Sequence, residues 1–330
     1  MKKVFIGIDV SKDWIDYAVR EAGLQDSAPA KRVNNDLENI TKLCQNLLKR
    51  HGQQNPHVVF EHTGNFGLLL SCVLESFAIP YSIVPALEIK LSLGITRGKS
   101  DVVDAGRIGD YAVINEHKLQ PTKLPSEALL QIKELLTYRL QLVKISVQLK
   151  NSLKAHKIAS SVSHLKNIVE DIEQKIEGYK VDIERIEKQI KELINKEPEL
   201  KKNFGYITSV KGIGLMIAAY MIVTTHNFIS FDNPRKFNCY AGIAPFEHTS
   251  GSSIRGKTQT SNLANKTVKT LLYSGAMSAA NHDPQLKKYY QRKRAEGKEH
   301  QTVINAIACK LTSRAFATVK RQSNFVVLAI

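Results

Sequence analysis

The chain has 330 residues, more than one compact hydrophobic core usually holds, and 43% of them are hydrophobic, which excludes a disordered chain. A count of 47 lysines and arginines against 31 aspartates and glutamates gives a formal net charge of +16, so the expected partner is a large polyanion such as nucleic acid. The four cysteines form no CxxC pair, which argues against a zinc ribbon or a disulfide framework. The longest apolar run, 213–223, is too short to span a bilayer, and we expect a cytoplasmic protein without a membrane partner.

The first 124 residues predict a mixed α/β domain. Residues 4–10 are apolar except for Gly7 and Asp9, a pattern typical of a buried central strand, and 14–19 continues in extended form towards a hairpin partner around 31–33. The elements expected next are a helix at 34–50 capped by Asn34 or Asn35, a strand at 58–61, a helix at 64–77, a strand at 81–84 and a helix at 100–115 capped by Ser100. Strands followed by alternating helices and strands indicate a mixed sheet with helices packed on it.

Residues 125–200 predict two long helices, 126–159 and 161–196. The second carries apolar residues at alternating steps of four and three, which is the heptad pattern of a coiled coil. These residues are Leu165, Val169, Ile172, Ile176, Tyr179, Ile183, Ile186, Ile190 and Leu193. Such a seam must be covered, so the helix packs against the preceding helix as a hairpin, against another subunit, or against both.

Residues 201–330 predict a third, mostly helical domain. The segment 207–214 resembles half of a helix-hairpin-helix, a motif in which backbone amides of a glycine turn can meet a phosphate, and a simple helix–turn–helix core explains it about as well. A loop rich in glycine, serine and threonine is expected at 249–257, and helices at 262–280 and 301–319.

Four acidic residues of the first domain are candidates for a metal site. Asp9 lies inside an apolar strand, where a carboxylate is costly unless it is paired or bound to a cation, and Glu61 ends the next predicted strand. Asp101 and Asp104 are three residues apart at the start of a helix and therefore share a face. Oxygen ligands at one sheet edge suit Mg²⁺ or Mn²⁺, and two such ions can hold a scissile phosphate.

Several short motifs, taken in order, resemble a known family. They are Gly-Ile-Asp-Val-Ser-Lys at 7–12, Glu-x-Thr-Gly at 61–64, Ser-Asp-x-x-Asp at 100–104, Tyr-Ala-Gly-Ile-Ala-Pro at 240–245 and Thr-Ser-Gly at 249–251. Together they resemble bacterial insertion-sequence transposases with a RuvC-like DEDD domain and the related DNA invertases. The resemblance implies a ribonuclease-H-like (RuvC-like) domain at 1–124, a coiled-coil helical hairpin at 125–200 and a mostly helical transposase domain at 201–330.

The resemblance also implies roles for individual residues and partners. Asp9, Glu61, Asp101 and Asp104 would be the metal ligands, and Ser250 would attack a DNA phosphodiester and form a covalent phosphoserine link. Donor and target DNA are the substrates, a structured guide RNA is an expected partner, and the chain would act near the nucleoid as a dimer or tetramer with an active site shared between subunits. The residues alone leave Ser250, Ser252 and Ser253 as competing nucleophiles, because a serine hydroxyl needs activation and spacing does not choose among them.

Basic residues are the candidate nucleic-acid contacts. Arg97, Lys99 and Arg107 flank the acidic helix, Lys211 lies in the glycine turn, and Arg255 and Lys257 follow the serines, near His248 as a candidate proton shuttle. The run 287–294 adds further cations interleaved with Tyr289 and Tyr290, which favours backbone contacts and stacking, although a solvated charged helix face is the alternative. The cations of that run are Lys287, Lys288, Arg292, Lys293 and Arg294.

Three functions are compatible with these features. A recombinase would use the acids and the serine to cleave and rejoin DNA by transesterification. A RuvC-like nuclease or branched-DNA resolvase would need the acids and would use water instead of the serine. A non-catalytic nucleic-acid scaffold would need neither. The predicted meeting of acids at strand ends and a helix start favours the two catalytic hypotheses, and the resemblance favours the recombinase.

Overall fold

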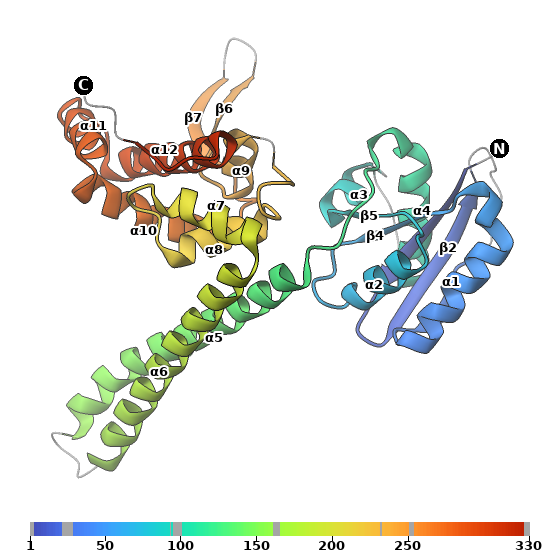
Figure 1. The fold of residues 1–330 in the computed structure, drawn as a ribbon, viewed down its shortest axis with the longest axis horizontal. Helices are drawn as coiled ribbons and strands as arrows, with labels where there is room; N and C mark the ends of the chain where they lie inside the picture. Colours follow the sequence, from blue (N-terminus) through green and yellow to red (C-terminus); the bar gives the residue numbers. More distant parts are fainter. Residues whose placement is uncertain are drawn as a thin grey trace. The chain divides into compact units, whose positions relative to one another are not determined.

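The structure is a computed structural model that describes residues 3–21, 29–92, 94, 101–160, 166–231, 233–250 and 254–326. The chain divides into two compact units, Met1–Leu124 and Pro125–Ile330, whose elements are labelled in Figure 1. Each unit is described by itself. Among the helices so described, none has the length and apolar character needed to cross a membrane.

The first unit is built on a five-stranded sheet in the order β3-β2-β1-β4-β5. Its strands are β1 Val4–Val10, β2 Trp14–Glu21, β3 Lys31–Asn34, β4 His57–Glu61 and β5 Tyr81–Val84. The first three strands form an antiparallel meander, whereas β4 and β5 run parallel to β1. The predicted mixed α/β sheet is therefore confirmed.

Helices cover both faces of this sheet. On one face, α1 Leu37–His51 and α2 Leu68–Ser76 share a core with alternate residues of β1, including Ile6 and Ile8. On the other face, α3 Ala86–Ser92 and α4 Asp101–Ile114 pack against Phe5 and Val59. Because successive side chains of a strand alternate between faces, these two cores tell which face every strand residue occupies.

Two helices of this unit begin later than the sequence pattern predicts. Asp36, rather than Asn34 or Asn35, caps α1 by accepting a hydrogen bond of 2.8 Å from the backbone N–H of Asn39. The helix expected from residue 64 begins at Leu68, because Gly64 has a φ of +68° that a helix cannot continue. A short 3₁₀ turn, Gly52–Gln54, follows α1, and a second, Glu116–Lys118, follows α4.

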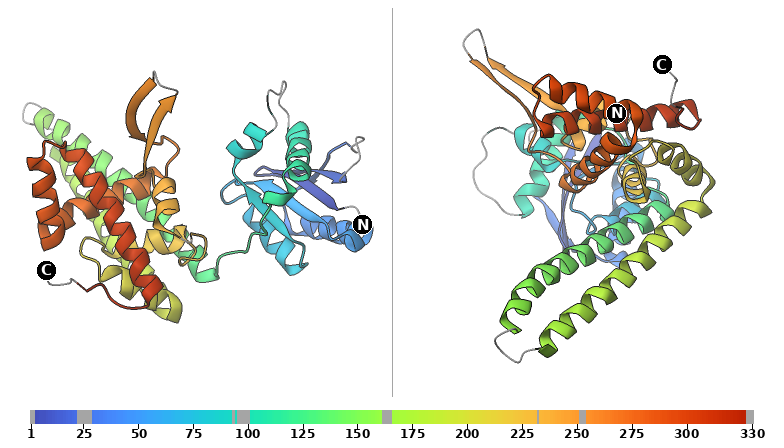
Figure 2. Two further views of the ribbon diagram at one scale, coloured as in Figure 1. Left: turned by 90° about the horizontal axis from the view of Figure 1, so that it is seen from above. Right: turned by 90° about the vertical axis from the view of Figure 1, so that its left-hand side faces the viewer.

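The second unit begins with two long helices that pack side by side, α5 Glu127–Ser160 and α6 Lys166–Lys196, as Figure 2 shows. Ile172, Ile186 and Ile190 of the predicted seam are buried, whereas Leu165 lies outside the described residues. A regular coiled coil stays a prediction. One hydrophobic core includes residues of α5, of α6 and of the helices after them, so the boundary predicted at residue 200 also stays a prediction.

The remaining helices of this unit surround the same core. They are α7 Pro198–Thr208, α8 Leu215–Thr224, α9 Pro234–Tyr240, α10 Lys266–His282, α11 Pro284–Ala295 and α12 His300–Arg321. Helix α10 begins four residues later than predicted, where Asn265 accepts from the backbone N–H of Val268. The described residues of the loop expected at 249–257 lie instead in an antiparallel hairpin, β6 Pro245–Ser250 and β7 Ile254–Thr260, whose strands project from the helices of their unit (Figures 1 and 2).

A buried ion pair joins α11 to α12. The carboxylate of Asp283, whose side chain is 1% exposed, caps α11 by accepting from the backbone N–H groups of Gln285 and Leu286, and it also accepts from Nη1 of Arg314 at 2.8 Å. Removing one partner of such a pair leaves the other charge buried without its counter-charge. The pair therefore ties the end of one helix to the middle of another.

We expect Asp283→Ala to lower the free energy of unfolding of the second unit by about 3 kcal/mol or more, because a helix cap is lost and Arg314 is left unpaired. Chemical denaturation followed by circular dichroism measures the change. Asp171→Ala is the matched control, since it removes an exposed carboxylate that pairs with Lys175 on one helix, and it should leave stability unchanged. Equal stability of Asp283→Ala and the parent chain would contradict this role.

Candidate functional site

Asp9 and Glu61 lie side by side at the ends of neighbouring parallel strands. The register pairs Ile8 with Phe60, which makes Asp9 and Glu61 the next neighbours across β1 and β4. Both face α4, because Gly7 and Val59, two residues earlier on each strand, pack on that face. The structure thus brings two of the four predicted acids to one sheet edge and one face.

Helix α4 runs antiparallel to β1 and brings its first turn towards this edge. Gly7 lies against Ala105 and Gly109, whereas Arg20, the cross-strand partner of Phe5, forms an ion pair with Asp110, nearer the C-terminal end of α4. The direction from Phe5 through Gly7 to Asp9 therefore leads to the start of α4, where Asp101 and Asp104 are found. The side chain of Asp101 lies outside the described residues.

The carboxylate of Asp104 is engaged by its own helix, because its Oδ1 accepts from Nη1 of Arg107 at 2.9 Å. Among the residues that the structure describes, no group of three or more histidine, cysteine, aspartate or glutamate side chains is arranged to hold a metal ion. The four-carboxylate ligand set therefore stays a prediction, with Asp9 and Glu61 placed side by side and the first turn of α4 facing them.

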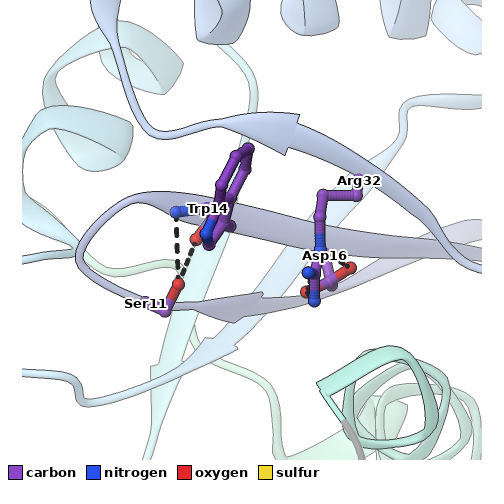
Figure 3. Close-up of polar contacts among 4 residues, drawn as sticks. All are labelled: Ser11, Trp14, Asp16 and Arg32. Atoms are coloured by element: carbon purple, nitrogen blue, oxygen red, sulfur yellow. Dashed lines mark hydrogen bonds and ion pairs between the residues drawn. The ribbon is translucent and has the colours of Figure 1, made fainter.

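Two residues that sequence reasoning missed extend the row of charges. Asp16 pairs directly with Asp9 across the β1–β2 hairpin, is 2% exposed, and lies on the same face. Arg32, its partner on β3, donates from Nε to Oδ1 at 3.0 Å and from Nη2 to Oδ2 at 2.8 Å, as Figure 3 shows for the pair. The row across β3, β2, β1 and β4 therefore reads Arg32, Asp16, Asp9 and Glu61.

A signal for Asp16 exists in the sequence but requires the hairpin register. Asp9 and Asp16 are equally far from the turn at 11–14, so a hairpin centred there places them opposite each other. Like charges directly across a sheet are unfavourable, and the bidentate contact with Arg32 compensates the second charge. The acidic row, which consists of Asp16, Asp9 and Glu61, therefore has a counter-charge, Arg32, at its β3 end.

The candidate nucleophile Ser250 is the last residue of β6 and pairs in register with Ile254 of β7. Ser252 and Ser253 lie outside the described residues, as do the side chains of His248, Ser250, Arg255 and Lys257. The backbone of Ser250 lies at the end of β6, a strand in which Phe246 and Glu247 are exposed. The choice among the three serines therefore stays a prediction.

The predicted nucleic-acid contacts differ in their surroundings. Arg97, Lys99 and Ser100 lie outside the described residues, and Arg107 is paired with Asp104. Lys211 donates to the backbone carbonyl of His282 at 3.3 Å. Its turn packs closely on α10, because a Cβ on Gly212 would come within 2.7 Å of the carbonyl oxygen of Gly275.

Helix α11 presents cations, whereas its tyrosines are engaged by the protein. Lys287, Lys288, Arg292 and Arg294 are exposed, and Lys293 forms a 2.6 Å ion pair with Glu296. The ring of Tyr289 is half-buried beneath Arg292 and Lys310, and the hydroxyl of Tyr290 lies 2.8 Å from Nδ1 of His300. This arrangement favours structural roles for the rings and leaves the cations as candidate phosphate contacts.

Comparison with known protein families shows to which class of enzyme the chain belongs. Residues 6–156 match the family DEDD_Tnp_IS110, described as a transposase, and residues 205–291 match the family described as Transposase IS116/IS110/IS902. The chain is therefore a transposase, an enzyme that cleaves and rejoins DNA. Because its two matches are the two domains of one family, it belongs to the IS110 family of transposases.

Individual relatives agree with this assignment. The pilin gene-inverting proteins of Moraxella bovis and Moraxella lacunata are each 26% identical, with 98% of both chains covered. An IS110 protein of Streptomyces coelicolor is 33% identical over 34% of this chain and 28% of its own. Among solved structures, T. thermophilus RuvC in complex with a Holliday junction substrate covers 36% of this chain and 99% of its own, with 13% identity and a TM-score of 0.29, a score too low to assign the fold.

Proposed function

We propose that the first unit is a ribonuclease-H-like (RuvC-like) catalytic domain that uses bound divalent cations to cut DNA during recombination. The observation that carries this proposal is the juxtaposition of Asp9 and Glu61 on one face of the sheet, opposite the first turn of α4. The strand order, with an antiparallel meander followed by two parallel strands, supports it. Transposition of an insertion element and inversion of a DNA segment are both outcomes of such chemistry.

The donor set fits a hard cation. Asp9, Glu61, Asp101 and Asp104 offer carboxylate oxygens, which suit Mg²⁺ or Mn²⁺, and the resemblance to the family implies two ions. When bound, such ions polarise a phosphate and stabilise the leaving oxygen. Asp104 would exchange its ion pair with Arg107 for the cation, and the released guanidinium would then be available to a DNA phosphate.

The covalent step is assigned to Ser250. Its Oγ attacks the phosphorus, the bond from phosphorus to the leaving DNA oxygen breaks, and that oxygen takes up a proton while the serine loses one. The resulting phosphoserine diester keeps the DNA ready for rejoining, because a DNA hydroxyl can attack the same phosphorus and release the serine with its proton restored. A guide RNA that selects the DNA and an assembly of two or four chains complete the proposal.

Trapping the covalent intermediate tests the serine. We expect the full chain with Mg²⁺, its co-purified RNA and matching DNA to give a protein–DNA adduct that survives denaturation, and Ser250→Ala to give none while still binding DNA. Ser252→Ala and Ser253→Ala are the matched controls and should form the adduct. Cleavage by Ser250→Ala without an adduct would favour the alternative, a RuvC-like nuclease that uses water.

A further inference from the structure

Trp14 is an exposed aromatic residue beside the acidic row. It is the single tryptophan of the chain and is 45% exposed at the start of β2. Asp16 and Ala18, two and four residues further along the strand, point to the α4 face, so Trp14 belongs to that face as well. Its indole therefore lies on the same side of the sheet as Asp9 and Glu61.

The backbone that carries Trp14 is held in place. The hydroxyl of Ser11 accepts from the backbone N–H of Trp14 and donates to its carbonyl at 2.9 Å, the two contacts drawn in Figure 3. Asn35 donates from Nδ2 to the carbonyl of Ser11 at 2.8 Å, and its backbone N–H donates to the carbonyl of Asp13. The turn is therefore ordered before any ligand arrives, which lowers the entropic cost of binding there.

Arg32 on β3 lies beside Trp14. Its guanidinium carbon lies 5.8 Å from the centre of the Trp14 ring, and its side chain is 44% exposed. Both carboxylate oxygens of Asp16 accept from it, so the charge of Asp16 is compensated by a bidentate contact. The same contact fixes the guanidinium plane, and a fixed planar donor is well suited to a phosphate.

We propose that Trp14 and Arg32 form a subsite for the DNA strand next to the phosphate being cut. An unpaired base stacks on the indole, a neighbouring backbone phosphate meets Arg32, and Asp16 is a positioning residue that orients Arg32. This subsite rests on the proposed function, because Asp9 and Glu61 would have to hold the cation that binds the scissile phosphate for the flanking DNA to lie here. The two strand spacings from Asp9 to Arg32, about 10 Å, are a span that adjacent nucleotides of one strand cover.

Charge and chemistry point to DNA as the occupant. The chain has a net charge of +16 and belongs to a family of DNA-cleaving and rejoining enzymes. Aromatic platforms beside cations are the usual way in which proteins hold single-stranded nucleic acid, since every base offers a face for stacking. Strand exchange requires bases that have left their duplex, and such bases are free to stack.

Intrinsic fluorescence tests the proposal directly, because Trp14 is the sole tryptophan. We expect a short single-stranded DNA oligonucleotide, added to the full chain in the presence of a chelator, to quench its emission. Anisotropy of a labelled oligonucleotide should show binding weakened about 5- to 100-fold in Trp14→Leu and largely retained in Trp14→Phe. Arg32→Gln should lower the slope of log affinity against log salt by about 1, and Arg32→Lys should restore it.

Two controls lie on α1, which covers the opposite face of the sheet. Lys42→Gln removes one positive charge and Leu37→Ala removes exposed apolar area, and both should bind the oligonucleotide as the parent does. DNA that binds fully without quenching would overturn the subsite, as would quenching by RNA alone. Neither result bears on the proposed catalytic domain, which is tested separately by whether cleavage survives the loss of the acids.

Discussion

Asp9→Asn or Glu61→Gln is expected to slow DNA cleavage by more than about 100-fold, because even a residue that merely supports a metal ligand typically contributes 10- to 100-fold. Both substitutions keep the shape of the side chain and remove the charge that a hard cation requires. The measurement is single-turnover cleavage of matched DNA with saturating Mg²⁺. DNA binding in a chelator should be unchanged, because the residues predicted to contact DNA phosphates are cations and not these acids.

A second readout separates loss of metal from loss of fold. Mg²⁺ should raise the melting temperature of the parent chain, because a ligand that binds only the folded state stabilises it, and this increase should be smaller in both variants. Asp110→Asn is the matched control, since Asp110 lies on α4 but pairs with Arg20 at 2.6 Å. It should cleave like the parent. Normal cleavage by Asp9→Asn would instead show that this carboxylate is not part of the cleavage site.

The position of Asp9 was predictable from sequence because a carboxylate inside an apolar strand is conspicuous by itself. Glu61 was predictable as the end of a strand, but its adjacency to Asp9 depends on which strands are neighbours. Asp16 was not predicted as a site residue, because its significance arises only from the strand register that places it opposite Asp9. Local pattern thus gives the candidates, and pairing between strands decides which candidates meet.

The serine hairpin shows a different limit of sequence reasoning. Glycine, serine and threonine dominate 249–257, a composition typical of a loop. The structure nevertheless pairs Thr249 with Arg255 and Ser250 with Ile254, so the described residues of this segment lie in strands. Backbone pairing between two strands is possible for polar residues, and a short exposed hairpin shows little hydrophobic alternation in its sequence.

Gly7→Ala is expected to destabilise the first unit by about 2–4 kcal/mol, because the added methyl group overlaps with backbone atoms of α4 at its close contact with β1. A Cβ at this position would overlap with the backbone of Ala105 and Gly109 and come within 2.7 Å of the Cα of Gly109. Backbone atoms of a helix cannot move aside as a flexible side chain does. Helix α4 must therefore shift away from β1, which thermal or chemical unfolding of the full chain measures.

The same shift should impair catalysis in the molecules that remain folded. Gly7 lies two residues before Asp9, and the displaced helix carries Asp101 and Asp104, so a movement of about 1 Å at this contact is expected to lower the cleavage rate about 100-fold. Gly52→Ala is the matched control, because Gly52 has a helical φ of −57° and open space around it. That variant should keep full activity and equal or higher stability. If Gly7→Ala retained parental stability and cleavage, the close approach of α4 to β1 could not be what aligns the acids, and the glycine of the Gly-Ile-Asp motif would need another explanation.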